Sequence, residues 1–137
     1  MLEPCVMMVE VTRAVLARIL DEAALAHPHE CCGILLGDAQ TIRALKPATN
    51  IHSAPDRHFE IDPQALVDAH RAARAGGPAV VGYYHSHPVG QAVPSSVDRA
   101  LAAHDGRIWA IAAEGEVRFW QDDEAGFEAL SLRVIDR

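Results

Sequence analysis

Apolar residues recur along the chain with two periods, and these periods predict an alternation of strands and helices. Strands are indicated by continuous apolar runs or by apolar residues at every second position, bounded by turn-forming residues. The continuous run Cys31 to Gly37 is typical of a strand in the middle of a sheet. The predicted strands span residues 5–11, 31–37, 41–45, 59–61, 79–87, 107–113, 116–121 and 127–135.

Three segments carry apolar residues three or four positions apart, which is the helical period. They predict helices over residues 12–26, 63–75 and 95–104, separated from the strands by loops at 50–57, 88–94 and 122–126. Thr12 and Asp62 are suited to cap the first two helices, and Pro63 is favourable at a first helical position.

Three helices and a larger number of strands in mixed order predict an α/β (α+β) fold: a mixed, largely antiparallel sheet flanked by helices. A length of 137 residues, half of them hydrophobic, fits a single domain over residues 1–137 with one core.

Charge and cysteine content narrow the classes of partner and compartment. The 12 basic and 19 acidic residues give a net charge of −7, which disfavours a nucleic-acid partner. No apolar stretch is long enough to cross a membrane, and no basic segment precedes an apolar one at the N-terminus. The cysteines at positions 5, 31 and 32 do not suggest a disulfide framework, so a reducing cytoplasm is expected. They are better explained as small buried residues than as metal ligands.

A cluster of metal-ligand residue types lies at the end of the strand predicted over residues 79–87. His85 and His87 are two positions apart, so both side chains point to one face of that strand. Asp98, at the start of the third predicted helix, adds a carboxylate from another element. Two imidazoles and one carboxylate leave a fourth position on a tetrahedral zinc ion for water, as in catalytic sites.

Each of these residues also has a structural explanation. His85 and His87 are also compatible with a hydrogen-bonded pair in the core. Ser95 and Asp98 have the spacing of a helix-capping box, and a carboxylate is favourable in a first helical turn. Burying the Glu30 carboxylate beside a buried strand would cost folding free energy, unless the carboxylate is paired or lies at the rim of the sheet.

Taken together, these residues resemble the motif of the JAMM, or MPN-plus, zinc metalloproteases. That motif consists of an upstream glutamate, then His-x-His-Pro, six residues and Ser-x-x-Asp. Here Glu30 precedes Cys31-Cys32-Gly33, and His85-Ser86-His87-Pro88 is followed after six residues by Ser95-Ser96-Val97-Asp98. The resemblance extends over about residues 9–117, and the absence of large insertions is similar to the compact, stand-alone prokaryotic members.

The resemblance implies a curved sheet with an architecture like that of the cytidine deaminases, whose own signature is absent. It implies one zinc ion per chain held by His85, His87 and Asp98, with Glu30 as general base and Ser95 as oxyanion stabiliser. The implied substrate is the tail of a ubiquitin-like or sulfur-carrier protein, cleaved at a peptide or isopeptide bond. A non-catalytic MPN scaffold and a zinc amidase for small substrates remain alternatives, and the sequence does not indicate an oligomeric state.

Overall fold

The computed structural model describes residues 7–136, which form three helices and eight strands. The helices are α1 (Arg13–Ala26), α2 (Pro63–Arg74) and α3 (Ser96–Leu101). The strands are β1 (Met8–Thr12), β2 (Cys32–Asp38), β3 (Thr41–Ala48), β4 (Ala79–Ser86), β5 (Ile108–Ala113), β6 (Glu116–Asp123), β7 (Gly126–Ala129) and β8 (Ser131–Ile135).

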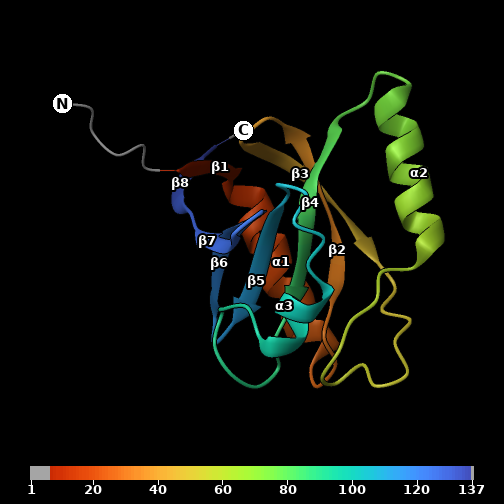
Figure 1. The fold of residues 1–137 in the computed structure, drawn as a ribbon, viewed down its shortest axis with the longest axis vertical. Coiled ribbons are helices and arrows are strands. Elements are labelled where there is room, and N and C mark those ends of the chain that lie inside the picture. The colour runs from red at the N-terminus through yellow and green to blue at the C-terminus, as the bar shows by residue number, and fades with distance from the viewer. Residues whose placement is uncertain (1–6, 137) are drawn as a thin grey trace.

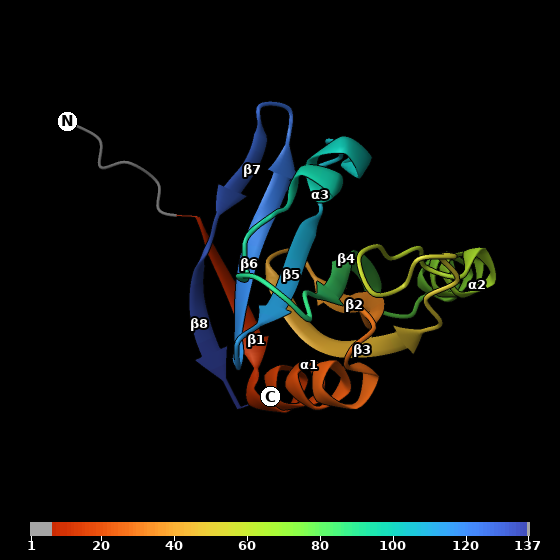
Figure 2. The same ribbon diagram turned by 90° about the horizontal axis from the view of Figure 1, so that it is seen from below.

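All eight strands belong to one mixed sheet in the order β7-β6-β5-β4-β2-β3-β1-β8. The pairs β1–β3, β1–β8 and β4–β5 are parallel, and the other four pairs are antiparallel. The sheet curves around α1, whereas α2 and α3 lie on the other side (Figures 1 and 2). The predicted mixed, largely antiparallel sheet flanked by helices is therefore confirmed.

The core lies in the concave space between α1 and the sheet. Val15 and Ile19 of α1 are buried there against strand residues such as Leu35 and Ile42. Burial of one such side chain contributes about 1.5–3 kcal/mol. The buried Tyr84 of β4 reaches α1 and donates a hydrogen bond of 2.7 Å from its hydroxyl to Glu22. This packing holds the central strands β2 and β4 in place.

The last predicted strand, over residues 127–135, is wrong in one respect, because the chain forms two strands there. β7 pairs with β6 at one end of the sheet, and β8 pairs with β1 at the other end. Leu130 lies between them, is only 9% exposed, and donates its N–H to the carbonyl of Phe119. The curvature of the sheet brings its two ends close enough for four-residue β7 to be followed at once by β8.

Other predicted boundaries shift for local reasons. No strand forms over residues 59–61, where Ile61 makes only an isolated bridge with Asn50. α3 ends at Leu101, because His104 adopts a positive φ of 55° and donates its N–H to the Asp122 carboxylate. β3 and β6 each run about two or three residues further than predicted. Residues 5 and 6 of the first predicted strand lie outside the described residues.

None of the helices in the described part of the chain has the length and apolar character needed to cross a membrane. Cys31 and Cys32 are both free thiols in the structure, while Cys5 lies outside the described residues.

Candidate metal centre

The two predicted histidine ligands lie where β4 ends, in the middle of the sheet. β4 runs between β2 and β5, and His85 is paired with Cys32 on one side and Ile111 on the other. His87 follows the strand and donates its backbone N–H to Ala112 of β5. The alternation of the strand directs both imidazoles to the same face, as the sequence predicted.

Three candidate ligand atoms converge at this point. His85 Nε2 lies 3.2 Å from His87 Nε2 and 3.2 Å from Asp98 Oδ2, and His87 Nε2 lies 3.1 Å from Asp98 Oδ2. Ligands about 2.0–2.1 Å from a tetrahedral zinc ion are separated by roughly 3.3 Å. The observed triangle therefore has the size of one face of such a site. Within residues 7–136, this is the one group of three or more such ligands that could hold a metal ion.

The surroundings of the imidazoles favour metal binding through Nε2. The Nδ1 atom of His87 lies 2.8 Å from the backbone oxygen of Gln91, so Nδ1–H donates to this oxygen and leaves Nε2 free. The ring of His85 is stacked on that of Phe59, with centroids 4.3 Å apart, and meets the edge of Trp109. Burial lowers the pKa of His85, which favours its neutral, ligating form.

Asp98 belongs to the first turn of α3 and is almost completely buried. Its Oδ2 accepts the backbone N–H of Ser95 at 2.9 Å, and Ser95 Oγ accepts the backbone N–H of Asp98 at 3.0 Å. The predicted capping box is therefore present together with the ligand cluster. Burial acts to raise the pKa of Asp98, but hydrogen bonds from His85 and His87 outweigh it and hold that pKa well below its ordinary value.

Glu30 lies just before β2 and faces the same pocket without belonging to the ligand triangle. Its backbone is held on both sides: its N–H donates to Pro55 and its carbonyl accepts from the Asn50 side chain. Burial raises the pKa of Glu30 to about 7, although the nearby His87 acts in the opposite direction. A carboxyl group with this pKa can both accept and return a proton near neutral pH.

A pocket of about 530 Å³ joins these groups. Glu30, His87 and Ser95 all line it, so the two predicted catalytic residues face the predicted ligand His87 across one cavity. The remaining lining residues come from the chain just after α1, the segment after β3, the loop before α3 and the first turn of α3: His27, Pro28, Asp56, Arg57, Pro88, Val89 and Val97.

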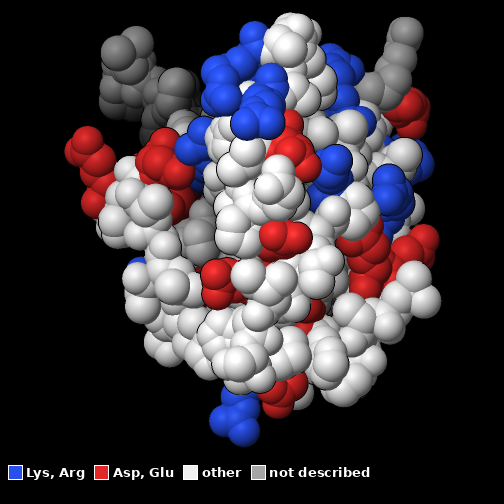
Figure 3. Space-filling view, turned by 90° about the vertical axis from the view of Figure 1, so that its right-hand side faces the viewer, with Lys and Arg blue, Asp and Glu red and all other residues white. Residues whose placement is uncertain are grey.

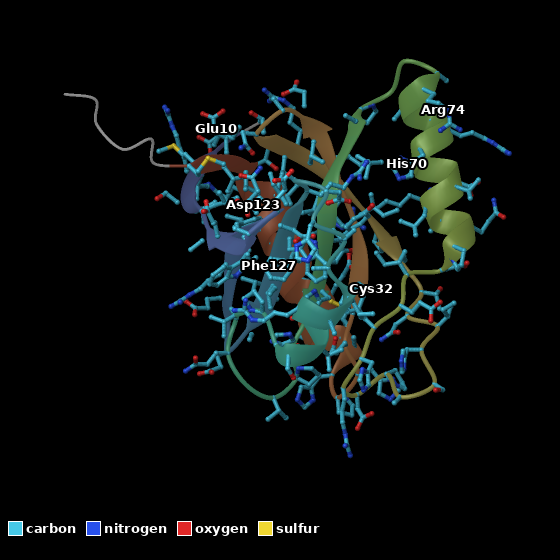
Figure 4. The ribbon with its side chains drawn as sticks, viewed as in Figure 1. Glu10, Cys32, His70, Arg74, Asp123 and Phe127 are labelled. Carbon is cyan, nitrogen blue, oxygen red and sulfur yellow. The ribbon has the colours of Figure 1, made fainter. Side chains whose placement is uncertain are left out.

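Ser86, which lies between the two histidines, has a structural role. Ser86 Oγ accepts the backbone N–H of Cys31 at 2.9 Å, and Ser86 N–H donates to the carbonyl of Cys31. These bonds attach the start of β2, next to Glu30, to the end of β4. His70, like the other histidines outside the triangle, belongs to no ligand group within the described residues, and it projects from α2 toward the sheet (Figure 4).

Three neighbours of the site were not identified as functional from the sequence. Phe59 and Trp109 surround the His85 ring, and Asn50 links the segment before β2 to the segment before α2. Asn50 Nδ2 donates to Glu30 and His58 carbonyls, and its Oδ1 accepts two backbone N–H groups. All three lie within the range of about residues 9–117 that resembles the JAMM family, but that resemblance was not used to assign them a role.

Comparisons with known proteins give the same picture as the geometry. A desampylase from Haloferax volcanii is 36% identical over 126 residues, which are 88% of this chain and 89% of the relative. A probable TtuB-protein conjugate cleaving protease from Thermus thermophilus is 37% identical over 82 residues, 60% of this chain and 52% of the relative. The fold is that of a JAB1/MPN domain protein from Archaeoglobus fulgidus, with a TM-score of 0.65 and 23% identity over 93% of this chain and 98% of that one.

The match to a family extends over most of the chain. Residues 12–123 match the family described as Prok-JAB, prokaryotic homologs of the JAB domain, and this range contains Glu30, His85, His87, Ser95 and Asp98. The predicted membership of a stand-alone prokaryotic JAMM family is therefore confirmed: the chain belongs to the prokaryotic homologues of the JAB domain.

Proposed function

We propose that this protein is a zinc metallopeptidase that hydrolyses the peptide or isopeptide bond after the Gly-Gly-type tail of a ubiquitin-like or sulfur-carrier protein. The observation that supports this most strongly is the ligand triangle of His85, His87 and Asp98, because its member His87 lines one pocket with Glu30, whose pKa is raised to about 7. The proposal includes one zinc ion per chain, a single domain over residues 1–137 and action in a cytoplasm.

Each side chain of the site has a separate role in the proposed hydrolysis. His85, His87 and Asp98 would hold the zinc ion, which when bound would acidify water and polarise a carbonyl group. Glu30 takes a proton from the attacking water and passes it to the leaving amine. The Ser95 hydroxyl, whose oxygen already accepts the Asp98 N–H, retains its own proton to donate to the developing oxyanion. Phe59 covers the His85 ring and limits its contact with water.

The names of two relatives support a substrate of this class, since one is a desampylase and the other is described as cleaving TtuB-protein conjugates. A flexible glycine tail suits a metal centre at the end of a central strand, because glycine lets the substrate backbone approach closely. No strand forms over residues 50–61, so this segment offers no edge strand with which the tail could pair. We propose instead that the tail lies in the pocket beside this segment.

Mass spectrometry of a carrier protein extended beyond its diglycine tests the proposal. We expect the zinc-loaded protein to release the extension and leave a product ending at the second glycine. The same incubation with small amides and with unrelated folded proteins separates the alternatives. Equal cleavage of unrelated proteins would indicate a general peptidase, cleavage of amides alone a small-substrate amidase, and no cleavage of any substrate a scaffold.

A further inference from the structure

A second pocket, of about 360 Å³, lies beside the metal centre and is separated from it by Phe59. The Phe59 ring stacks on the ligand His85 and also lines this second pocket. The pocket lies between α2 and the end of α3, over β4 and β5. The apolar part of its wall consists of Phe59, Ile61, Pro63, Leu66, Tyr83, Leu101, Ala103 and Trp109.

A third hollow adjoins both pockets. It shares Val97 with the metal pocket and shares Phe59, Glu60 and Leu101 with the second pocket. The three hollows therefore lie next to one another along α3, and this row of hollows from Ser95 to the second pocket forms the groove.

The charged residues of the second pocket are all acidic. Glu60, Asp105 and Asp122 line it, and no lysine or arginine among residues 7–136 does. Asp105 is already paired with Arg107 at 2.9 Å, and Asp122 accepts the backbone N–H of His104 at 2.9 Å. The face that carries α2 likewise shows acidic side chains over its middle, with basic ones gathered at its top end (Figure 3).

Glu60 is the acidic residue that is free to bind a partner. Its backbone is fixed, because its N–H donates to Asn50 Oδ1 and its carbonyl accepts the N–H of Ile51. Its exposed carboxylate forms no hydrogen bond or ion pair with any of residues 7–136. It lines both the hollow and the second pocket, so it lies along the groove that leads to the metal.

We propose that Glu60 and the second pocket select a lysine or arginine side chain in the substrate tail, before the glycines. The long apolar stem of such a residue would pack on Phe59, Tyr83 and Trp109, and its charged end would meet Glu60. This inference rests on the proposed function, since it concerns the tail that the metal centre cleaves.

The position of the pocket indicates the part of the substrate that it contacts. Glu30 returns its proton to the leaving amine, and it lies with His27 and Pro28 on the α1 side of the metal pocket. Ser95 and Val97 lie on the α3 side, where the groove begins. The acyl part of the substrate therefore extends along the groove. Three to five residues of extended chain span roughly 10–16 Å, so a side chain that far before the cut reaches the second pocket.

Fluorogenic peptides test this selection. The probes are acetyl-Ala-Ala-Ala-Gly-Gly-aminocoumarin and its variants with lysine or glutamate at each alanine. We expect lysine at one position to raise kcat/KM about five- to tenfold over glutamate at that position. Glu60→Gln should reduce this ratio to below about twofold, and Glu60→Lys should invert it. Glu128→Gln, which removes an exposed carboxylate from β7, should leave the ratio unchanged.

A binding measurement separates failure of this inference from failure of the proposed function. Anisotropy with dye-labelled forms of the same peptides and the inactive Glu30→Gln variant should show the same lysine preference, removed by adding Glu60→Gln. Equal affinity and equal kcat/KM for lysine and glutamate at every position would overturn the inference. If the parent cleaves no diglycine substrate, the proposed function fails. The binding measurement alone then tests whether Glu60 and the second pocket prefer lysine over glutamate.

Discussion

Replacement of Glu30 by glutamine should make the zinc-free protein more stable at pH 8, although the same change removes the general base of the zinc-loaded protein. The carboxyl group is buried, and its burial raises the pKa from an ordinary value of 4.5 to about 7. The folded state therefore binds the proton of Glu30 more tightly than the unfolded state does. Glutamine keeps the shape of the side chain and carries no charge to desolvate.

The size of the effect follows from this pKa. Below pH 4.5 the carboxyl is protonated in both states, and stability is unaffected. As the pH rises through 4.5 and on to about 7, the unfolded state loses the proton first, and the folded state is progressively destabilised. The full difference corresponds to about 3 kcal/mol, of which about 2.5 kcal/mol develops between pH 5 and pH 8.

Urea denaturation of chelator-treated protein at pH 5 and pH 8 measures this difference. The free energy of unfolding of Glu30→Gln, minus that of the parent, should grow by about 2.5 kcal/mol from the lower to the higher pH. The control Glu128→Gln removes a carboxylate that is exposed, and its difference from the parent should stay within about 0.5 kcal/mol. A Glu30→Gln difference that does not change with pH would refute the argument that burial sets the pKa of Glu30.

Three further outcomes follow from individual contacts. Asn50→Ala leaves the carbonyls of Glu30 and His58 without their donor, so urea denaturation should show a free energy of unfolding lower by about 2–3 kcal/mol. An unchanged midpoint would show that Asn50 does not hold the backbone of Glu30 in place. Gly82→Ala places a Cβ against the carbonyl oxygen of Ile108, so the same assay should show a free energy of unfolding lower by about 3 kcal/mol. Stability equal to that of the parent would contradict this close approach of β4 and β5. The zinc-loaded protein needs deprotonated Glu30, so its kcat/KM should rise with pH. The midpoint should lie below 7, because the zinc cation favours the carboxylate form of Glu30, and a flat profile between pH 5 and 7 would contradict the role of Glu30 as base.

The ligand triangle was predictable because each part of it follows from local sequence. His85 and His87 share a face through the strand period, and Ser95 with Asp98 forms a helix start at a fixed spacing. Glu30 was assigned through its match to the JAMM motif, since its approach to His87 depends on how β2 and β4 pair. Most helices and strands were predictable for the same local reasons.

The rest depends on contacts between distant segments. Residues 127–135 have a pattern that suits one strand, and only the curvature of the whole sheet divides them around Leu130. Phe59 contacts His85 across 26 positions of sequence, whereas its alternation with Ile61 predicted a short strand and not this contact. Asn50 binds the backbone of residues 30 and 58, and such bonds follow from the paths of two loops rather than from residue type.

Zinc content measured by elemental analysis tests the central claim most directly. Protein purified without added metal should contain one zinc ion per chain, and Glu30→Gln should contain the same amount, because Glu30 lies outside the ligand triangle. His87→Ala removes one of three protein ligands and should lose most of the zinc. Equal zinc in the parent and His87→Ala, or loss of zinc from Glu30→Gln, would contradict the assignment of His85, His87 and Asp98 as the metal ligands and Glu30 as the base.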